Sequence, residues 1–383
     1  MPLHMNNIFS IIIVLALSLF AFNFLGNIVQ DDSSNAQEFA LGLDNTAYFP
    51  TDNNLRFHCS DFEYFPIENC INDFQKHKAG TKAILYSGNS QLHGINQPEL
   101  GLNSTSKILY QFLKKDYANK RLITLSIPNL NMQEQLVLNI FAGTKLPLTH
   151  LIISASFDNT RETSIRESIQ PALRDPLVIS TLNRMTFGKK IVKTYGEKDN
   201  AGNDLSVEQD NLQQRVEQYL DMQLADFWPA WDMRTRLRFR SIVETYQLRN
   251  RIFGITPNSI RKKIPARYKD NLAALEDLIS YAKTNNLKVI FYSPPIRSDQ
   301  SLPYESEQFL SYKNDVRSIV EIAGFNFYDF QNVVPPEYWG FVDDTNSNTG
   351  NKEIDFMHFQ GQGHEHLADE LLKSIKSLNW LDQ

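Results

Sequence analysis

The stretch Ala83-Ile-Leu-Tyr-Ser-Gly-Asn-Ser-Gln-Leu-His-Gly94 is the part of the chain from which its fold can be predicted. It begins with four apolar residues and continues into a Gly-Asn pair, a pattern typical of a buried strand that runs into a tight turn. Ser90 would lie just beyond the carboxyl end of that strand, where open α/β sheets bind their ligands. A serine hydroxyl is a weak nucleophile at neutral pH, so the position predicts a reactive serine only if the chain also supplies a base.

Four further apolar segments follow, and they alternate with segments of helical periodicity. This alternation predicts βαβ units and a parallel sheet. The loops that follow the first three strands, beginning near Gly88, Pro128 and Phe157, would therefore lie at one edge of the sheet. We expect strands at 83–86, 122–127, 148–154, 287–293 and 326–330, and helices at 104–117, 132–141, 268–285, 305–323 and 363–377.

Residues 165 to about 265 interrupt this alternation and are predicted to form a helical insertion, with helices at 165–186 and 205–227. Eleven Lys or Arg residues and a single acid, Glu244, lie between positions 234 and 269, although the whole chain has a net charge of −6. Such a cluster indicates either a surface for anionic lipid, an anionic polymer or an acidic partner, or a solvated face that pairs with acids elsewhere in the fold.

The first 30 residues predict the compartment. Ile8 to Val29 is a run of 22 residues without a charge, and a helix of that length spans about 30 Å, the thickness of a hydrocarbon core. We expect an N-terminal transmembrane helix in residues 1–30 that anchors the protein in the membrane, with the bulk of the chain extracytoplasmic, in the periplasm or at the cell surface. The alternative is a cleaved signal peptide, with a possible small-residue cleavage site at Ser34-Asn35-Ala36.

Residues 31–78 are predicted to form a polar stalk and a lead-in that carries both cysteines. An even cysteine count in an exported protein favours one disulfide between Cys59 and Cys70, and the alternative is two free buried thiols. The remainder, 79–383, is expected to form the catalytic domain together with the insertion.

Composition limits the function classes. The chain is 42% hydrophobic and 21% charged, which allows a sizeable core. It has no Gly-rich phosphate loop, zinc-type cysteine spacing or nucleic-acid module. We expect no nucleic acid partner, no metal site and no cofactor.

The base is predicted some 270 residues after the serine, in Asp355-Phe-Met-His358. In a turn that enters a helix, this spacing lets the carboxylate reach Nδ1 of the imidazole while Nε2 faces outward. The predicted catalytic residues are therefore Ser90 as nucleophile, His358 as base and Asp355 as the group that orients the base.

Gly88-Asn89-Ser90, the two intervening strand-end loops and Asp355-x-x-His358 before the last helix resemble the SGNH (GDSL-type) hydrolase superfamily. The resemblance covers about 80–160 and 266–380, and it implies a flavodoxin-like three-layer αβα sandwich with a Ser-His-Asp triad. More narrowly, the N-terminal anchor, the strand 289–293 followed by Pro294-Pro295, and the ending 355–363 are similar to membrane-anchored SGNH proteins. These are the D-alanyl transfer protein and the alginate O-acetyltransferase-type partners of membrane-bound O-acyltransferases.

The sequence departs from the family pattern in the groups that would bind the oxyanion. Asn129 stands where the family's second motif has a glycine whose amide enters the oxyanion hole. Asp158 stands where the third motif has its amide donor, and an ionised carboxylate cannot donate. The resemblance therefore implies Asn129 by its backbone N–H, Asn159 if the loop is shifted by one residue, and Arg161 as a further oxyanion or substrate group.

The function predicted from these features is acyl transfer, O-acetyl or similar, through an acyl-Ser90 intermediate to a hydroxyl of an envelope or exported polysaccharide. The expected partner is a membrane-bound O-acyltransferase that presents the acyl group. Two alternatives stay open: an esterase or deacetylase that uses water on the same site, and a non-catalytic partner of the membrane O-acyltransferase.

Overall fold

The structure is a computed structural model that describes residues 51–52, 55–60, 67–76, 82–93, 103–117, 119–196, 245, 248–254, 259–343 and 352–380. The chain divides into two units, one of Met1–Leu43 and Asp199–Gly254 and one of Asp44–Lys198 and Ile255–Gln383. In the first unit the described residues, 245 and 248–254, are largely helical. The sheet, the helices on its two faces and the candidate site all belong to the second unit.

A six-stranded sheet forms the centre of this unit, and every pair of neighbouring strands is parallel. The order is β3-β5-β4-β6-β7-β8, so the last five strands follow the flavodoxin-like order and β3 is added at one edge. The strands are β3 (His58–Cys59), β4 (Lys82–Gly88), β5 (Lys120–Ser126), β6 (Leu148–Ser154), β7 (Lys288–Ser293) and β8 (Asn326–Asp329).

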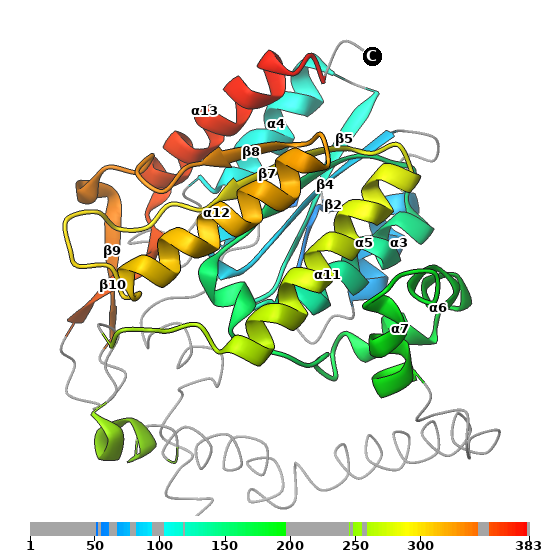
Figure 1. The fold of residues 1–383 in the computed structure, drawn as a ribbon. Coiled ribbons are helices and arrows are strands. Elements are labelled where there is room, and N and C mark those ends of the chain that lie inside the picture. The colour runs from blue at the N-terminus through cyan, green and yellow to red at the C-terminus, as the bar shows by residue number, and fades with distance from the viewer. Residues whose placement is uncertain are drawn as a thin grey trace, which may run out of the picture. The chain divides into compact units, whose positions relative to one another are not determined.

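Helices cover both faces of the sheet (Figure 1), which gives the predicted three-layer parallel α/β fold. On one face α4 (Thr105–Asp116) contacts β5 and α13 (Gly361–Ser377). On the other face α5 (Met132–Lys145) packs against α3 (Ile67–Lys76) and α11 (Pro265–Thr284), and α11 contacts α12 (Ser306–Ile322). The five predicted strands and five predicted helices of the sheet are all confirmed, with ends that differ by a few residues.

The strand order places a topological switch point at β4. The chain continues from β4 to β5 on one side and later adds β6 on the other side, so the connections after β4 and β6 diverge at the carboxyl end of the sheet. A crevice at such a point is where doubly wound sheets bind ligands. Ser90 follows β4 and therefore lies at this point.

The lead-in before residue 79 contributes to the sheet. Thr51–Asp52 (β1) and Leu55–Arg56 (β2) form a small antiparallel pair, and β3 then pairs with β5. The predicted disulfide is present: Cys59 on β3 is bonded to Cys70 on α3, with their Cα atoms 5.9 Å apart. The bond joins a two-residue edge strand to the buried face of α3.

Two predictions about irregular segments were wrong. No continuous helix spans 165–186, because Pro171 and Pro176 cannot lie in a helix interior. The segment instead has a 3-10 turn, η3 (Gln170–Arg174), and short helices α6 (Pro176–Leu182) and α7 (Gly188–Ile191). Residues 331–354 have the sequence pattern of a loop, with Pro335-Pro336 and a polar run at 343–351, but they contain β9 (Trp339–Asp343), which pairs antiparallel with β10 (Lys352–Phe359).

Other predictions fall on residues that the structure does not describe. The anchor at residues 1–30, the stalk up to residue 50 and the helix at 205–227 all lie outside the described ranges. Among the residues that are described, no helix is long and apolar enough to cross a membrane.

Candidate active site

The turn after β4 holds Ser90 in a fixed position. Ser90 begins a short 3-10 turn, η1 (Ser90–Leu92), in which the Asn89 side-chain oxygen accepts a hydrogen bond from the Gln91 N–H at 3.0 Å. The Asn89 amide donates to Ser156 Oγ at 3.2 Å, which links this turn to the loop after β6. Gly88 is required for close packing, since a Cβ there would lie 2.8 Å from Leu92 Cδ1. The Ser90 side chain is half-buried.

The segment that carries Asp355 and His358 lies on β10, whereas the sequence predicted a turn that enters a helix. The register between β9 and β10 shifts between Ile354 and Phe359, so four residues of β10 lie opposite Gly340 alone. Bulges of this kind redirect side chains and are common beside active sites. Asp355 stabilises this one, because its Oδ1 accepts the N–H groups of Met357 (2.9 Å) and His358 (3.0 Å).

The three predicted catalytic residues meet at the carboxyl end of the sheet. Nδ1 of His358 lies 2.9 Å from Asp355 Oδ2, and Nε2 of His358 lies 3.0 Å from Ser90 Oγ. An ionised Asp355 can only accept, so Nδ1 carries the proton and donates it to the carboxylate. Nε2 then accepts a hydrogen bond from the Ser90 hydroxyl, which is the arrangement of a nucleophile with an oriented general base.

Asp355 is held in the charged form. The side chain is buried, and burial alone would raise its pKa, but the charge of His358, the hydrogen bond from its ring and the two backbone N–H groups outweigh burial. The net result is a pKa of Asp355 below its ordinary value. An ionised Asp355 stabilises the imidazolium that forms when His358 takes a proton.

The second strand-end loop follows β5 and contains Asn129. Its φ of 53° lies in the left-handed region, which glycine adopts freely and asparagine tolerates better than most other residues. Arg166 donates to the carbonyl oxygens of Pro128 (3.0 Å) and Asn129 (3.2 Å) and so fixes the loop.

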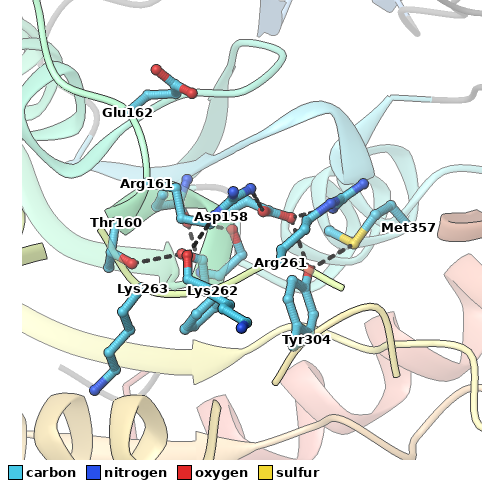
Figure 2. Close-up of polar contacts among 12 residues, drawn as sticks. Asp158, Thr160, Arg161, Glu162, Arg261, Lys262, Lys263, Tyr304 and Met357 are labelled. Atoms are coloured by element: carbon cyan, nitrogen blue, oxygen red, sulfur yellow. Dashed lines mark hydrogen bonds and ion pairs between the residues drawn. The ribbon is translucent and has the colours of Figure 1, made fainter. Parts of the chain in front are cut away.

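The third strand-end loop follows β6, and its acid Asp158 lies between arginine side chains (Figure 2). Asp158 Oδ2 accepts hydrogen bonds from Arg261 Nη1 and from the Tyr304 hydroxyl, both at 2.8 Å. The Tyr304 hydroxyl also lies 3.7 Å from the sulfur of Met357, in the base segment. Asp158 therefore acts as an acceptor that joins this loop to the end of the insertion.

The remaining predicted oxyanion residues have structural partners. Asn159 is buried; its Oδ1 accepts from the Ser156 N–H (2.6 Å) and hydroxyl (2.7 Å), and its amide donates to the carbonyl oxygen of Leu130. Arg161 lies 3.5 Å from Asp158 Oδ1 and donates to the carbonyl oxygen of Lys262 at 3.1 Å. These contacts tie the loops together, and an oxyanion role for Asn129, Asn159 or Arg161 stays a prediction.

The described end of the basic segment pairs with acids. Arg261, Lys263 and Arg267 form ion pairs with Asp158 (2.8 Å), Asp315 (3.4 Å) and Glu162 (3.1 Å), respectively. For these three residues the structure favours a face that pairs with acids within the fold.

Buried histidines lie close to the site. His93 is fully buried and shares a hydrogen bond with the carbonyl oxygen of Ser126 at 3.3 Å, while His364 accepts from the Thr105 N–H at 3.3 Å. Burial, together with the charge of His358, lowers the pKa of each of these two histidines to about 3. Both are therefore neutral near pH 7, and among the histidines that the structure describes, His358 is the one that contacts Ser90.

Sequence reasoning missed one buried residue at the site, Gln91, which directly follows Ser90. Its amide donates to the carbonyl oxygens of Pro295 (2.8 Å) and Met357 (2.9 Å). Apart from its place next to Ser90, nothing in the sequence pattern singles it out.

The chain matches no protein-family model and no curated protein. Among solved structures it is similar to a putative acylhydrolase from Bacteroides fragilis (11% identity, TM-score 0.34), covering 79% of this chain and 89% of that one. It is also similar to an acetylxylan esterase from Geobacillus stearothermophilus (13% identity, TM-score 0.34, 78% and 96% covered) and a GDSL-like lipase from Bacteroides thetaiotaomicron (11%, 0.35, 79% and 94%). At these identities and TM-scores the similarity says nothing about what this chain binds, so the site is judged by its own geometry.

Proposed function

We propose that the protein is a serine-dependent acyl-transfer enzyme of the SGNH type. The observation that carries the proposal is the continuous chain from Ser90 Oγ to His358 Nε2 (3.0 Å) and from His358 Nδ1 to Asp355 Oδ2 (2.9 Å). Both distances are within the range in which a base removes a hydroxyl proton. The half-buried serine at the switch point of the sheet gives an ester substrate access.

In the first half-reaction His358 Nε2 takes the Ser90 proton while Oγ attacks the acyl carbonyl carbon. The tetrahedral intermediate collapses, the bond to the leaving alcohol breaks, and that alcohol receives the proton from His358. In the second half-reaction a hydroxyl of the acceptor gives its proton to His358 and attacks the acyl-Ser90 ester. The acyl group moves to the acceptor, and Ser90 regains its proton.

The preferred acceptor is a hydroxyl of a cell-envelope or exported polysaccharide, and the preferred acyl donor is supplied by a membrane-bound O-acyltransferase. The charge-free run Ile8–Val29 supports a site held at a membrane surface. The Cys59–Cys70 disulfide supports an oxidising, extracytoplasmic compartment. Water is the acceptor in the second candidate, an esterase, because an acyl-serine is chemically the same whichever hydroxyl resolves it.

A specific observation also favours a non-catalytic alternative. Asp158 stands at the position where the family has its amide donor. Its carboxylate accepts hydrogen bonds from Arg261 and Tyr304 and offers no donor to an oxyanion. A site without that donor loses transition-state stabilisation, and removing one oxyanion donor typically costs about 10²–10³-fold in rate.

The test is acylation of the full chain by p-nitrophenyl acetate, followed by intact-protein mass spectrometry and by release of p-nitrophenol. The wild type is expected to show a burst and an acetyl adduct on Ser90, and Ser90→Ala and His358→Ala are expected to show neither. An oligosaccharide added to the acyl-enzyme then separates transfer from hydrolysis. A folded wild type that forms no adduct and releases no product would refute both enzymatic candidates and leave the non-catalytic partner.

A further inference from the structure

The base segment has little support from its neighbouring strand. Because of the bulge, residues 355–358 of β10 lie opposite Gly340 of β9, and the ladder resumes only at Phe359. Buried backbone groups must find partners elsewhere. The Asp355 carboxylate accepts hydrogen bonds from the N–H groups of Met357 and His358, which fixes the conformation of the segment. These bonds lie within the segment, so they do not set its position relative to Ser90.

Contacts from two other segments set that position. The Arg297 N–H lies 3.5 Å from the Phe356 carbonyl oxygen, and the Arg297 guanidinium donates to the Gly340 carbonyl oxygen at 3.0 Å. Gln91 donates to the carbonyl oxygen of Met357, the residue directly before His358, at 2.9 Å. The same Gln91 amide nitrogen donates to the Pro295 carbonyl oxygen at 2.8 Å. Both of its hydrogens are therefore used, and the orientation of the Gln91 side chain is fixed.

We infer that Gln91 is a positioning residue that fixes the distance between Ser90 Oγ and His358 Nε2. It follows the nucleophile in a 3-10 turn and holds the base segment by a partly buried hydrogen bond, so it joins two groups that are 268 residues apart in sequence. Displacing a reacting group by about 1 Å can cost about 10²-fold in rate. The inference rests on the proposed acyl chemistry of Ser90.

A second observation indicates that this glutamine serves the site more than the stability of the fold. The Gln91 Oε1 atom is buried and has no hydrogen-bond partner among the described residues. An unsatisfied buried acceptor costs free energy, which an apolar side chain of similar length would avoid. A glutamine here is therefore explained by its two donated hydrogen bonds.

The test compares Gln91→Met with the wild type in the full chain. Methionine has a similar length and is apolar, so we expect the burst rate constant with p-nitrophenyl acetate to fall about 10- to 100-fold per folded molecule. The urea midpoint should fall, because the carbonyl oxygens of Pro295 and Met357 lose their donor, so the burst rate is compared per folded molecule. The matched control is Asn139→Leu, which removes a buried amide that donates to Ser87 Oγ (3.0 Å) and the Gln135 carbonyl (2.6 Å) within the core. We expect that variant to lose stability and to keep its burst rate.

A spectroscopic readout separates positioning from damage. The downfield proton resonance of His358 Nδ1–H reports the Asp355–His358 hydrogen bond, and we expect it to persist in Gln91→Met because Asp355 still caps the segment. Hydrogen exchange of residues 352–360 should become faster in Gln91→Met and stay unchanged in Asn139→Leu.

Each outcome has a distinct meaning. A burst rate of Gln91→Met within twofold of the wild type overturns the inference, and so does an equal fall in the burst rate per folded molecule in Asn139→Leu. If the wild type itself shows no burst, the proposed function fails, and hydrogen exchange alone then decides whether Gln91 holds the base segment. Unchanged exchange over 352–360 overturns the inference in that case too.

Discussion

Asp355→Asn is the substitution whose effect the geometry determines most closely. The new amide has two orientations. If its nitrogen replaced Oδ1, it would face the N–H groups of Met357 and His358, which now donate at 2.9 and 3.0 Å. Two buried donors would then lose their acceptor, at about 1–3 kcal/mol each. The amide nitrogen is therefore expected to replace Oδ2 and to face the imidazole.

In that orientation the amide donates to His358 Nδ1, and the ring must carry its proton on Nε2. The proton then points at Ser90 Oγ, 3.0 Å away, and the imidazole cannot accept the serine proton. General-base catalysis contributes about 10²–10⁴-fold, so we expect the acylation rate to fall by that factor. The cost in stability should be small, since both backbone hydrogen bonds to the segment are retained.

The assay is the burst rate constant with p-nitrophenyl acetate, with the folded fraction measured by circular dichroism. Asp355→Ala serves as the comparison, because it removes the backbone hydrogen bonds as well and should lose stability in addition to rate. A fully folded Asp355→Asn variant that acylates within threefold of the wild type, while Ser90→Ala is inert, would refute the assignment of Asp355 as the orienting group.

Three further predictions concern stability. His93 and His364 have pKa values of about 3 in the folded protein against an ordinary 6.5. The unfolded chain therefore binds more protons below pH 6.5, and these two histidines should lower the free energy of unfolding by about 2–3 kcal/mol between pH 7 and pH 5.5. Burial also lowers the pKa values of His58 and His150, which adds to this fall; urea midpoints that do not change with pH over this range would contradict this. Reduction of Cys59–Cys70 opens a short loop, so it should cost about 2–3 kcal/mol on the chain-entropy account, which calorimetry with and without reductant would measure. Gly88→Ala places a Cβ 2.8 Å from a buried leucine, and urea denaturation should show a loss of about 1–3 kcal/mol.

The features that sequence analysis predicted correctly are those with local signals. Ala83–Tyr86 is predicted as a strand because four apolar residues precede a turn. The position of Ser90 just beyond the carboxyl end of that strand then follows from the sequence. The Asp355-x-x-His358 pair was correctly expected to join its carboxylate to Nδ1 and present Nε2, because three-residue spacing allows this in more than one backbone conformation.

The features that it missed depend on partners far away in the chain. Residues 339–343 form a strand because β10 pairs with them, and the local sequence does not predict that pairing. The two residues of β3 are too few for any periodicity. The role of Gln91 requires a carbonyl 266 residues away, and Asn159 donates to a loop that follows a different strand. Such contacts depend on which strands and loops the fold brings together. The spacing of residues along one sequence does not predict them.

The pairing of β3 with β5 has a consequence for the handling of this protein in the laboratory. A shortened chain begun at residue 79 would retain Ser90, His358 and Asp355 but would lack His58–Cys59. The backbone donors and acceptors of β5 that face β3 would then be open to other molecules, and unpaired strand edges promote self-association. We expect such a fragment to precipitate or form soluble aggregates, and a fragment begun before β1 to remain monodisperse. Light scattering of the two preparations at equal concentration would distinguish them.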